Sequence, residues 1–349
     1  MGKPRLSPAE IVRSLGDFRG LKVLVVGDLF LDEYIEGEMF EISKEGPIPV
    51  VRLESRARTA GAAGNLASSI RNLGASVSVA AVVGRDANGR DLLLQLRQKG
   101  IRVAGVLVHP RNPTLTYTKL RARVENTPSR EILRMDILPG APLERGIERK
   151  LLAAIRREAR GADGIIVLDQ VRHVVSGRVL GALPRIARSS GALLHGSSRE
   201  QIAGFRGFNL ITPNDREARA AVGGGAVDPA RLGRALREKG KHEKVMLTLG
   251  ADGMALIERG QSIVRIPTYA REVLDVTGAG DAVSSVAMLG NILGWDIVTL
   301  GWTASQAAAI AVEHVGTHHV SLEELGRRIL EEGAESSLAI PHAASHEIF

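Results

Sequence analysis

Short, continuous apolar runs alternate along the chain with longer stretches of helical spacing. The first run, Lys22–Asp28, ends in Gly-Asp and predicts a strand that is buried on both faces, as in a parallel sheet covered by helices. The further runs of this kind are Val77–Val83, Gly164–Leu168, Ala192–Leu194, Asn209–Ile211 and Val245–Leu249. The stretches with helical periodicity between them are Ala63–Leu73, Gly89–Lys99, Leu143–Ala159, Gly177–Arg188 and Asp228–Lys239. The alternation predicts right-handed βαβ units and an α/β fold with a doubly wound, mostly parallel sheet flanked by helices.

Two segments, about 34–54 and 101–135, break this alternation. Both contain strand patterns and turn signals without a helical period, and Pro47 and Pro49 mark an edge position in the first. We expect them to form a small β-sheet inserted into the α/β core as a lid. Helical spacing returns towards the C-terminus, in the stretches Ala279–Leu293, Thr299–His314 and Leu322–Leu330.

Composition narrows the class of protein. Of the 349 residues, 44% are hydrophobic but only 3% are aromatic, so the core must be built from Val, Ile, Leu and Ala. This hydrophobic content excludes a disordered or fibrous protein. The absence of cysteine excludes disulfides, thiolate metal sites and cysteine nucleophiles. We expect one domain over residues 1–335 and a flexible polar tail over 336–349.

The distribution of apolar and charged residues also limits location and partners. No apolar run approaches the ~20 residues of a membrane span, and residues 1–20 lack a signal-peptide core, so we expect a cytoplasmic protein without a membrane partner. The net charge of +7 and the pI near 10 are compatible with nucleic-acid binding. However, no nucleic-acid-binding signature supports such a partner. Residues 111–160 hold twelve basic and six acidic residues, which is nearly all of the excess.

Within that basic segment, Lys119, Arg121 and Arg123 alternate with apolar residues. Strand periodicity places the three cations on one face. If this strand belongs to the lid, the face can receive a phosphorylated substrate, and arginine suits phosphate through bidentate contacts. A solvated strand face is the alternative, and the sequence leaves both open. The basic residues of Leu143–Ala159 are assigned to the solvent-exposed face of an amphipathic helix.

The most informative run is Asp275–Asp281 (DVTGAGD), which an apolar helical stretch follows. Gly278, Ala279 and Gly280 present unobstructed backbone N–H groups at the start of a helix, and such a turn binds anions. Asp281 then lies in the first helical turn, beside the bound anion. From there its carboxylate can take a proton from an attacking hydroxyl while the amides stabilise a transferring phosphoryl group. Taken alone, the run favours an ordinary helix start with an acidic first turn over an anion site.

Several motifs resemble those of the ribokinase-like (PfkB) carbohydrate kinases, in the same order. Residues 275–283 resemble the C-terminal signature of that family, and residues 61–67 (GAAGNLA) resemble its glycine-rich N-terminal signature. Its other elements are matched by Asn214–Glu217 (N-x-x-E), Thr248–Gly253 (nucleotide loop) and Ala307–Thr317 (terminal helix). Three runs, 27–34, 41–51 and 118–121, look most like the heptose-7-phosphate kinases, which form the kinase half of ADP-heptose synthase.

The resemblance implies a ribokinase-like fold and an ATP-dependent transfer of phosphate to a hydroxyl of a sugar or sugar phosphate. Asp281 would be the base. The anion hole would consist of Gly278, Ala279 and Gly280. Asn214 and Glu217 would hold Mg²⁺, directly or through water. The nucleotide would also contact Thr248, Gly250 and Gly253. The sugar would bind Asp28, Asp32, Gly61 and Asn65, with Lys119 and Arg121 added from the lid. A monovalent cation is left open.

Some of these residues have a simpler structural interpretation. Asp28 closes a strand and can cap a turn. Asn65 and Glu217 begin predicted helices, where such residues serve as caps or as partners of the helix dipole.

The sequence departs from the heptose-kinase pattern at four places. Gly196–Ser198 stands where those kinases usually carry Asp-Pro-Lys, and 169–173 stands where they carry Asp-Tyr-Gly-Lys-Gly. Ala62 replaces one of two paired glycines, and Ser305 replaces an asparagine in the terminal helix. The first two departures lie around the expected reaction centre. The alternatives are therefore a catalytically weak, regulatory relative and a kinase for a fructose- or ribose-type sugar.

The resemblance also bears on assembly. An H-x-G-H motif, which a nucleotidyltransferase domain would carry, does not occur, so we expect the stand-alone form of the kinase. The lid is expected to fold over the sugar, which limits wasteful hydrolysis of ATP, and to pair two chains into a homodimer.

Overall fold

The computed structural model describes residues 4–124, 127–223 and 228–338. Within these ranges, eight strands form the large sheet in the order β14-β13-β12-β11-β10-β9-β1-β4. Their bounds are β1 Lys22–Gly27, β4 Ser76–Ala80, β9 Gly164–Asp169, β10 Leu193–Ser198, β11 Leu210–Ile211, β12 Lys244–Thr248, β13 Met254–Glu258 and β14 Val264–Ile266. The strands from β12 to β4 are parallel, and β13 and β14 are antiparallel at one edge. The predicted doubly wound, mostly parallel sheet is confirmed.

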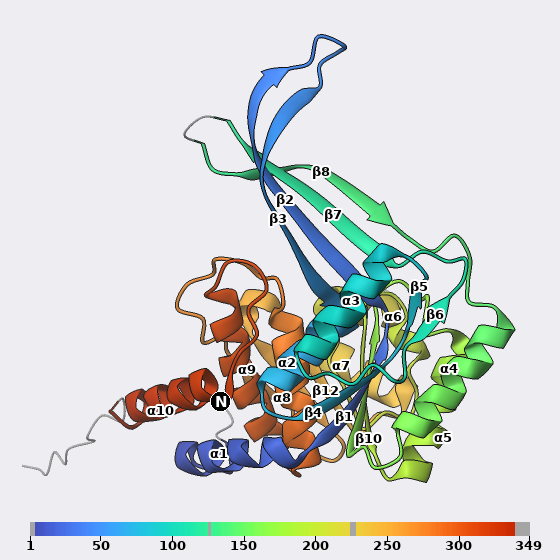
Figure 1. The fold of residues 1–349 in the computed structure, drawn as a ribbon. Coiled ribbons are helices and arrows are strands. Elements are labelled where there is room, and N and C mark those ends of the chain that lie inside the picture. Colours follow the sequence, from blue (N-terminus) through green and yellow to red (C-terminus); the bar gives the residue numbers. More distant parts are fainter. Residues whose placement is uncertain (1–3, 125–126, 224–227, 339–349) are drawn as a thin grey trace, which may run out of the picture.

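Helices cover both faces of this sheet (Figure 1). Their bounds are α1 Pro8–Leu15, α2 Ala63–Asn72, α3 Ala87–Gln98, α4 Arg145–Glu158, α5 Gly177–Ser190, α6 Asp215–Val222, α7 Pro229–Gly240, α8 Ala279–Ile292, α9 Ile297–Val312 and α10 Leu322–Leu338. One core packs α1, α2, α3, α8, α9 and α10 against one face, and a second core packs α4 to α7 against the other. Among the described helices, none is both long and apolar enough to cross a membrane.

Helix α8 is buried on nearly all sides, which fixes the position of its first turn. Its residues are mostly small or aliphatic, and every position from Ala282 to Asn291 is buried. Small residues let neighbouring groups approach closely: a Cβ at Gly290 would collide with the ring of Trp295. With so few aromatic residues, close approach of small side chains is how this core reaches high packing density.

The lid is a four-stranded sheet that stands away from the α/β body (Figure 1). Its order is β3-β2-β7-β8, with β2 Leu29–Ile42, β3 Pro49–Ala62, β7 Leu115–Arg123 and β8 Arg130–Ile137. Pro49 opens the edge strand β3, as its missing N–H predicts. Within the lid, Glu33 on β2 joins β3, because its carboxylate accepts from Arg56 and Arg58 at 2.7 Å each. Residues 125 and 126 of the second lid segment lie outside the described residues.

Three elements differ from the sequence prediction. The run Val77–Val83 is not one strand: it divides into β4 and β5 (Val82–Gly84), and β5 pairs with β6 (Leu107–His109) in a separate small sheet. The first lid strand begins at Leu29, directly after β1, because it continues the chain out of the large sheet without a loop. Helix α10 continues through residues 336–338, where the tail was expected to begin, and the remainder of that tail, 339–349, lies outside the described residues.

Candidate active site

The carboxyl ends of β9 and β10 and the starts of α6 and α8 surround a cavity of about 390 Å³. Its lining residues are Leu168, Gln170, Ser197, Arg199, Glu200, Asn214, Arg216, Glu217, Gly280 and Asp281. Ligands of open α/β sheets bind at this edge of the sheet. The fold therefore brings together in one cavity the predicted base, one glycine of the predicted anion hole and the predicted magnesium pair.

The start of α8 has the geometry of an anion site. Gly278 caps the helix with a left-handed φ of 86°, and Gly280 has no described atom within 4 Å of the place where a Cβ would stand. The Ala279 amide donates to the Val276 carbonyl at 3.3 Å, which leaves the amides of Gly280 and Asp281 for a ligand. The positive end of the helix dipole adds to their attraction for negative charge.

Asp281 lies at the end of a hydrogen-bonded chain of three side chains. Asn65 Nδ2 donates to Asp281 Oδ2, and His319 Nε2 lies 2.8 Å from Asn65 Oδ1. Because that amide oxygen can only accept, His319 is the donor and carries its proton on Nε2. Burial, together with the charges of Lys99 and His318, lowers the pKa of His319 to about 4, so the ring is neutral at pH 7.

The same surroundings make Asp281 a stronger base than an exposed aspartate. Burial raises the pKa of its carboxyl to about 6 against the hydrogen bond from Asn65, and the negative charge of Asp32 acts in the same direction as burial. A carboxylate with this basicity, beside free helix amides, is suited to take a proton from a hydroxyl at neutral pH.

Asn214 and Glu217 form a capping box at the start of α6, the simpler role that helix-cap chemistry predicts for Glu217. Asn214 Oδ1 accepts from the Glu217 amide at 2.8 Å, and the Glu217 carboxylate accepts from the Asn214 backbone and side chain. Both residues nevertheless line the cavity. Burial raises the pKa of Glu217, against hydrogen bonds from Asn214 and the charge of Arg199.

The predicted nucleotide residues lie at the end of β12 and in the turn after it, next to this capping box. Thr248 pairs with Asn214 through a parallel bridge, so the two strand ends lie side by side. Gly250 and Gly253 have left-handed φ angles of 61° and 79°. A side chain at Gly253 would also run into the backbone of Ile266 and Pro267, so the turn requires glycine there.

Asp32, Gly61 and Lys119 lie where the lid meets the body. Gly61 pairs with Phe30 across β2 and β3, and a Cβ on Gly61 would collide with the Asp32 carboxylate. Burial raises the pKa of Asp32, and the positive charges of Lys119 and Arg134 counteract it. Lys119 also lies over the ring of Tyr34, its partner in register on β2.

The other cations of this strand turn to partners within the lid. Arg121 forms an ion pair with Glu36 at 3.1 Å, and Arg123 forms a bidentate pair with Glu54 at 2.5 and 2.6 Å. The strand face therefore combines both interpretations that the sequence left open. Of the three, Lys119 lies nearest the body, where its charge acts on the Asp32 carboxyl, whereas the two arginines lie further along the lid in ion pairs.

Asp28 has a structural role. Its side chain is fully buried, and its carboxylate accepts from the backbone amides of Gln170, Val171 and Val174 at 2.8–3.0 Å. It fixes the loop after β9, and its fully buried oxygens are not exposed to a sugar hydroxyl. We therefore leave Asp28 out of the set of substrate-binding residues.

Sequence reasoning did not single out Arg199 or Asp169. Both lie at the carboxyl ends of parallel strands, where ligands of such sheets bind. Arg199 follows β10, lines the cavity and carries a positive charge close to Glu217. Burial raises the pKa of Asp169 to about 6, against a hydrogen bond from Ser198 at 2.7 Å. His319 was missed because nothing in the local sequence connects it with Asn65.

Packing explains why glycine stands at position 196, where the heptose-7-phosphate kinases usually carry aspartate. A Cβ at this position would meet the ring of Phe205, so the rings of Phe205 and Phe208 fill the space that a larger side chain would take. Ser197 replaces the neighbouring proline and lines the cavity, and Ser198 binds Asp169. The missing Asp-Pro-Lys is thus accommodated by a repacked core at the end of β10.

Comparison with known proteins identifies the family. The model of the pfkB family of carbohydrate kinases matches residues 23–138 and 160–325. This chain belongs to that family. As a member, it is an ATP-dependent carbohydrate kinase. The resemblance of the sequence motifs to this family is thereby confirmed.

Curated relatives include proteins called bifunctional protein HldE. The one from Geobacter metallireducens is 36% identical to this kinase over 311 residues, covering 88% of this chain and 62% of the relative. That from Wolinella succinogenes is 33% identical over 299 residues, covering 84% of this chain and 62% of the relative. The kinase thus spans less than two thirds of the length of these relatives.

Solved structures share the fold at low sequence identity. Phosphofructokinase-2 from Escherichia coli has a TM-score of 0.71 at 19% identity, with 89% of this chain and 99% of that chain covered. Ribokinase from Arabidopsis thaliana, solved with ribose and ATP, has a TM-score of 0.64 at 17% identity, with 90% and 98% covered. The predicted ribokinase-like fold is confirmed.

Proposed function

We propose that this kinase transfers the γ-phosphoryl group of MgATP to a sugar phosphate, and that the substrate is a heptose 7-phosphate phosphorylated at its 1-hydroxyl. The observation that carries the proposal is Lys119. It lies on the lid strand β7 in register with Tyr34. Burial acts to raise the pKa of the Asp32 and Asp275 carboxyls, and the positive charge of Lys119 opposes burial at both. A cation there can hold the phosphate of a substrate whose hydroxyl lies at Asp281. The similarity to HldE proteins and the heptose-kinase-like runs support this sugar.

Asp281 and the first turn of α8 perform the chemical step. The carboxylate of Asp281 accepts the proton of the attacking hydroxyl as its oxygen bonds to the γ-phosphorus. The bond from that phosphorus to the β,γ-bridging oxygen breaks, and ADP leaves. The amides of Gly280 and Asp281 stabilise the charge on the phosphoryl oxygens. Asn65, held by His319, keeps the Asp281 carboxylate in place. Asp32 and the backbone at Gly61 are assigned to sugar hydroxyls.

Asn214 and Glu217 would hold Mg²⁺, and the chemistry of their donors fits that ion. Mg²⁺ prefers carboxylate and carbonyl oxygens and keeps several of its waters. Because the capping box already uses one lone pair on each oxygen, contact through water suits this pair best. When bound, Mg²⁺ neutralises charge on the phosphates. The turn at Thr248, Gly250 and Gly253 is assigned to the nucleotide, and a monovalent cation remains part of the proposal. A related structure contains potassium.

The test measures ADP release from MgATP with a panel of sugars and sugar phosphates. We expect the highest kcat/KM with heptose 7-phosphate. Asp281→Asn should lower kcat by about 10²–10⁴-fold, the usual contribution of a general base, while MgATP still binds. Asp17→Asn, which removes an exposed carboxylate far from the cavity, is the matched control and should leave kcat unchanged.

Three results would count against parts of this proposal. Equal kcat/KM for heptose and heptose 7-phosphate would remove the phosphate-binding role. Similar turnover by Asp281→Asn and the wild type would remove the base. MgATP binding without turnover on any sugar would favour the regulatory, catalytically weak relative.

A further inference from the structure

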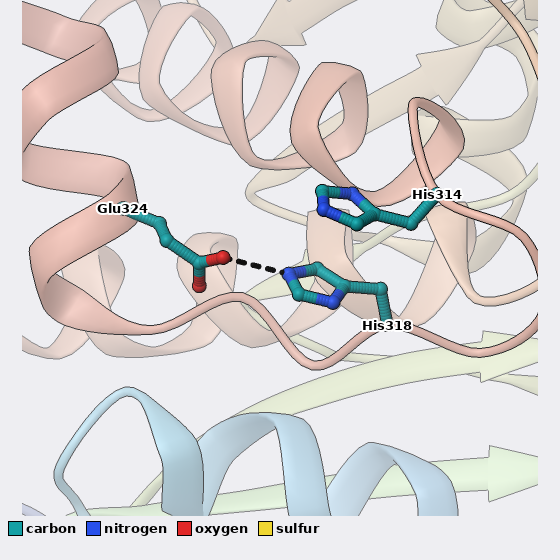
Figure 2. A group of neighbouring side chains, drawn as sticks. All are labelled: His314, His318 and Glu324. Atoms are coloured by element: carbon teal, nitrogen blue, oxygen red, sulfur yellow. Dashed lines mark hydrogen bonds and ion pairs between the residues drawn. The ribbon is translucent and has the colours of Figure 1, made fainter.

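The loop between α9 and α10 carries two histidines that meet a glutamate outside the phosphoryl-transfer cavity. Figure 2 shows His314 and His318 stacked, each turning a nitrogen edge towards the Glu324 carboxylate. The ring centroids are 3.8 Å apart and the planes differ by 6°. One ligand atom from each of the three residues lies within 4.8 Å of the other two.

The hydrogen bond of His314 leaves its second ring nitrogen in the form that a metal requires. His314 Nδ1 lies 2.8 Å from the carbonyl oxygen of Ile310, which can only accept. The neutral ring therefore carries its proton on Nδ1 and a lone pair on Nε2, the tautomer that binds metals with a backbone carbonyl as its outer partner.

The carboxylate and the second ring are equally well oriented. Without an ion, His318 Nε2 donates to Glu324 Oε1 at 3.0 Å, because a carboxylate oxygen can only accept. A metal that binds both atoms takes the place of this proton, and the ring then carries its proton on Nδ1. Glu324 Oε2 accepts from the amide and hydroxyl of Ser321, which fixes the carboxylate at the start of α10.

We propose that His314, His318 and Glu324 bind a divalent transition-metal ion such as Zn²⁺, with water in the remaining position. Two imidazoles and one carboxylate are a donor set that zinc, cobalt, nickel and copper take in preference to magnesium. Ligands about 2.0–2.1 Å from zinc lie roughly 3.3 Å apart in a tetrahedron. The three atoms reach that separation by rotation of side chains, since His314 is exposed and the other two are half-buried.

An ion at this site also restrains a loop that contacts the active site. Gly316 N donates to Asp275 Oδ2 at 3.0 Å, Thr317 lies against Gly278, and His319 holds Asn65. These residues lie between the two histidine ligands or directly after them. Metal binding therefore fixes the segment that positions Asn65 and, through it, Asp281.

The experiment is a calorimetric titration of the chelator-treated, dialysed protein with ZnCl₂ in saturating Mg²⁺, which occupies sites for hard ions. We expect one Zn²⁺ per chain, and Co²⁺ should give the visible absorption of a tetrahedral site. His314→Gln, His318→Gln and Glu324→Gln should each weaken Zn²⁺ binding by more than about 100-fold, beyond the usual cost of losing an outer partner. Glutamine preserves the capping box at position 324.

The matched control is Glu323→Gln, which removes the same charge one residue away, from an exposed position. It should bind Zn²⁺ as the wild type does. All four variants should melt with the wild type when no metal is present. Zn²⁺ should slow hydrogen exchange at amides 316–320 in the wild type and in Glu323→Gln only. Zn²⁺ binding that survives all three ligand substitutions, or no binding by the wild type, would overturn the proposal.

A kinetic measurement extends the test and rests on the proposed function. If Zn²⁺ binds and slows hydrogen exchange, but kcat for the sugar phosphate is unchanged, the metal site stands and its coupling to Asp281 is rejected. If no sugar is turned over at all, the proposed function fails, whereas the titration and exchange results still decide the metal site.

Discussion

Burial gives Asp281 a basicity that an exposed aspartate lacks, and the activity should therefore depend on pH in a defined direction. With its pKa raised to about 6, Asp281 is ionised and able to accept a proton above pH 6. Below pH 6 we expect kcat/KM to fall about tenfold for each pH unit, because only the ionised carboxylate is a base. A pH–rate profile measures this. A profile that stays flat down to pH 4, the ordinary range of aspartate, would contradict the assignment.

His319 is a positioning residue, and its role can be separated from a purely structural one. Without His319, Asn65 loses the partner that orients its amide towards Asp281, and the hydrogen bond that opposes the raised pKa of Asp281 weakens. His319→Ala should therefore lower kcat about tenfold and move the inflection of the pH–rate profile above pH 6. His319→Gln, which retains an N–H donor, should restore both. An unshifted inflection in His319→Ala would show that the residue does not act through Asn65.

At the scale of elements, the register of β7 against β2 decides which cation reaches the substrate. Lys119 pairs with Tyr34, close to the body, whereas Arg123 pairs with Glu38 further out. Lys119→Ala should raise KM for a phosphorylated sugar roughly 10- to 100-fold, since hydrogen bonds to charged groups contribute about 1.5–3 kcal/mol. The unphosphorylated sugar should be little affected.

Arg123→Ala is the matched control for Lys119→Ala, because Arg123 lies on the same strand face but pairs with Glu54. We expect its KM values to match those of the wild type. Steady-state kinetics with both sugars distinguish the two residues. If Lys119→Ala raised both KM values equally, the phosphate-binding role of Lys119 would be lost and a general role in lid packing would replace it.

At the scale of the molecule, the lid has two different faces. One face carries Lys119 and Arg134, which stand opposite each other on the neighbouring strands β7 and β8. On the opposite face Leu133, Met135 and Ile137 follow one another at every second position and are 41–51% exposed. An exposed apolar sheet face of this kind is typical of a surface that a partner covers. We propose that a second copy of the chain covers it, as the expected homodimer requires.

Met135→Glu should therefore convert a dimer into a monomer, because the interface would bury an unpaired charge. Analytical ultracentrifugation measures the change. Val108→Glu is the control, since Val108 is 47% exposed but lies on β6, outside the lid. A wild-type chain that sediments as a monomer, or a dimer that persists in Met135→Glu, would exclude this interface.

The sequence by itself determined what depends on neighbouring residues in the chain. Apolar runs and helical spacing predicted the parallel sheet and most of its helices, because burial on two faces or on one helical stripe dictates those periods. The Gly278–Asp281 turn was recognisable because its backbone geometry is local. The break between β4 and β5 was not, since both halves are equally apolar and only pairing with different partners separates them.

Only the tertiary structure decided which polar groups meet. Asn65 and Asp281 are 216 positions apart, and His319 is 254 positions from Asn65, so no local pattern links them. The same holds for Asp28, whose partners are backbone amides in the loop after β9, and for Gly196, where Phe205 takes the space of a side chain. Local periodicity follows from the chain, whereas the pKa of Asp281 and the surroundings of Lys119 follow from groups that folding brings together.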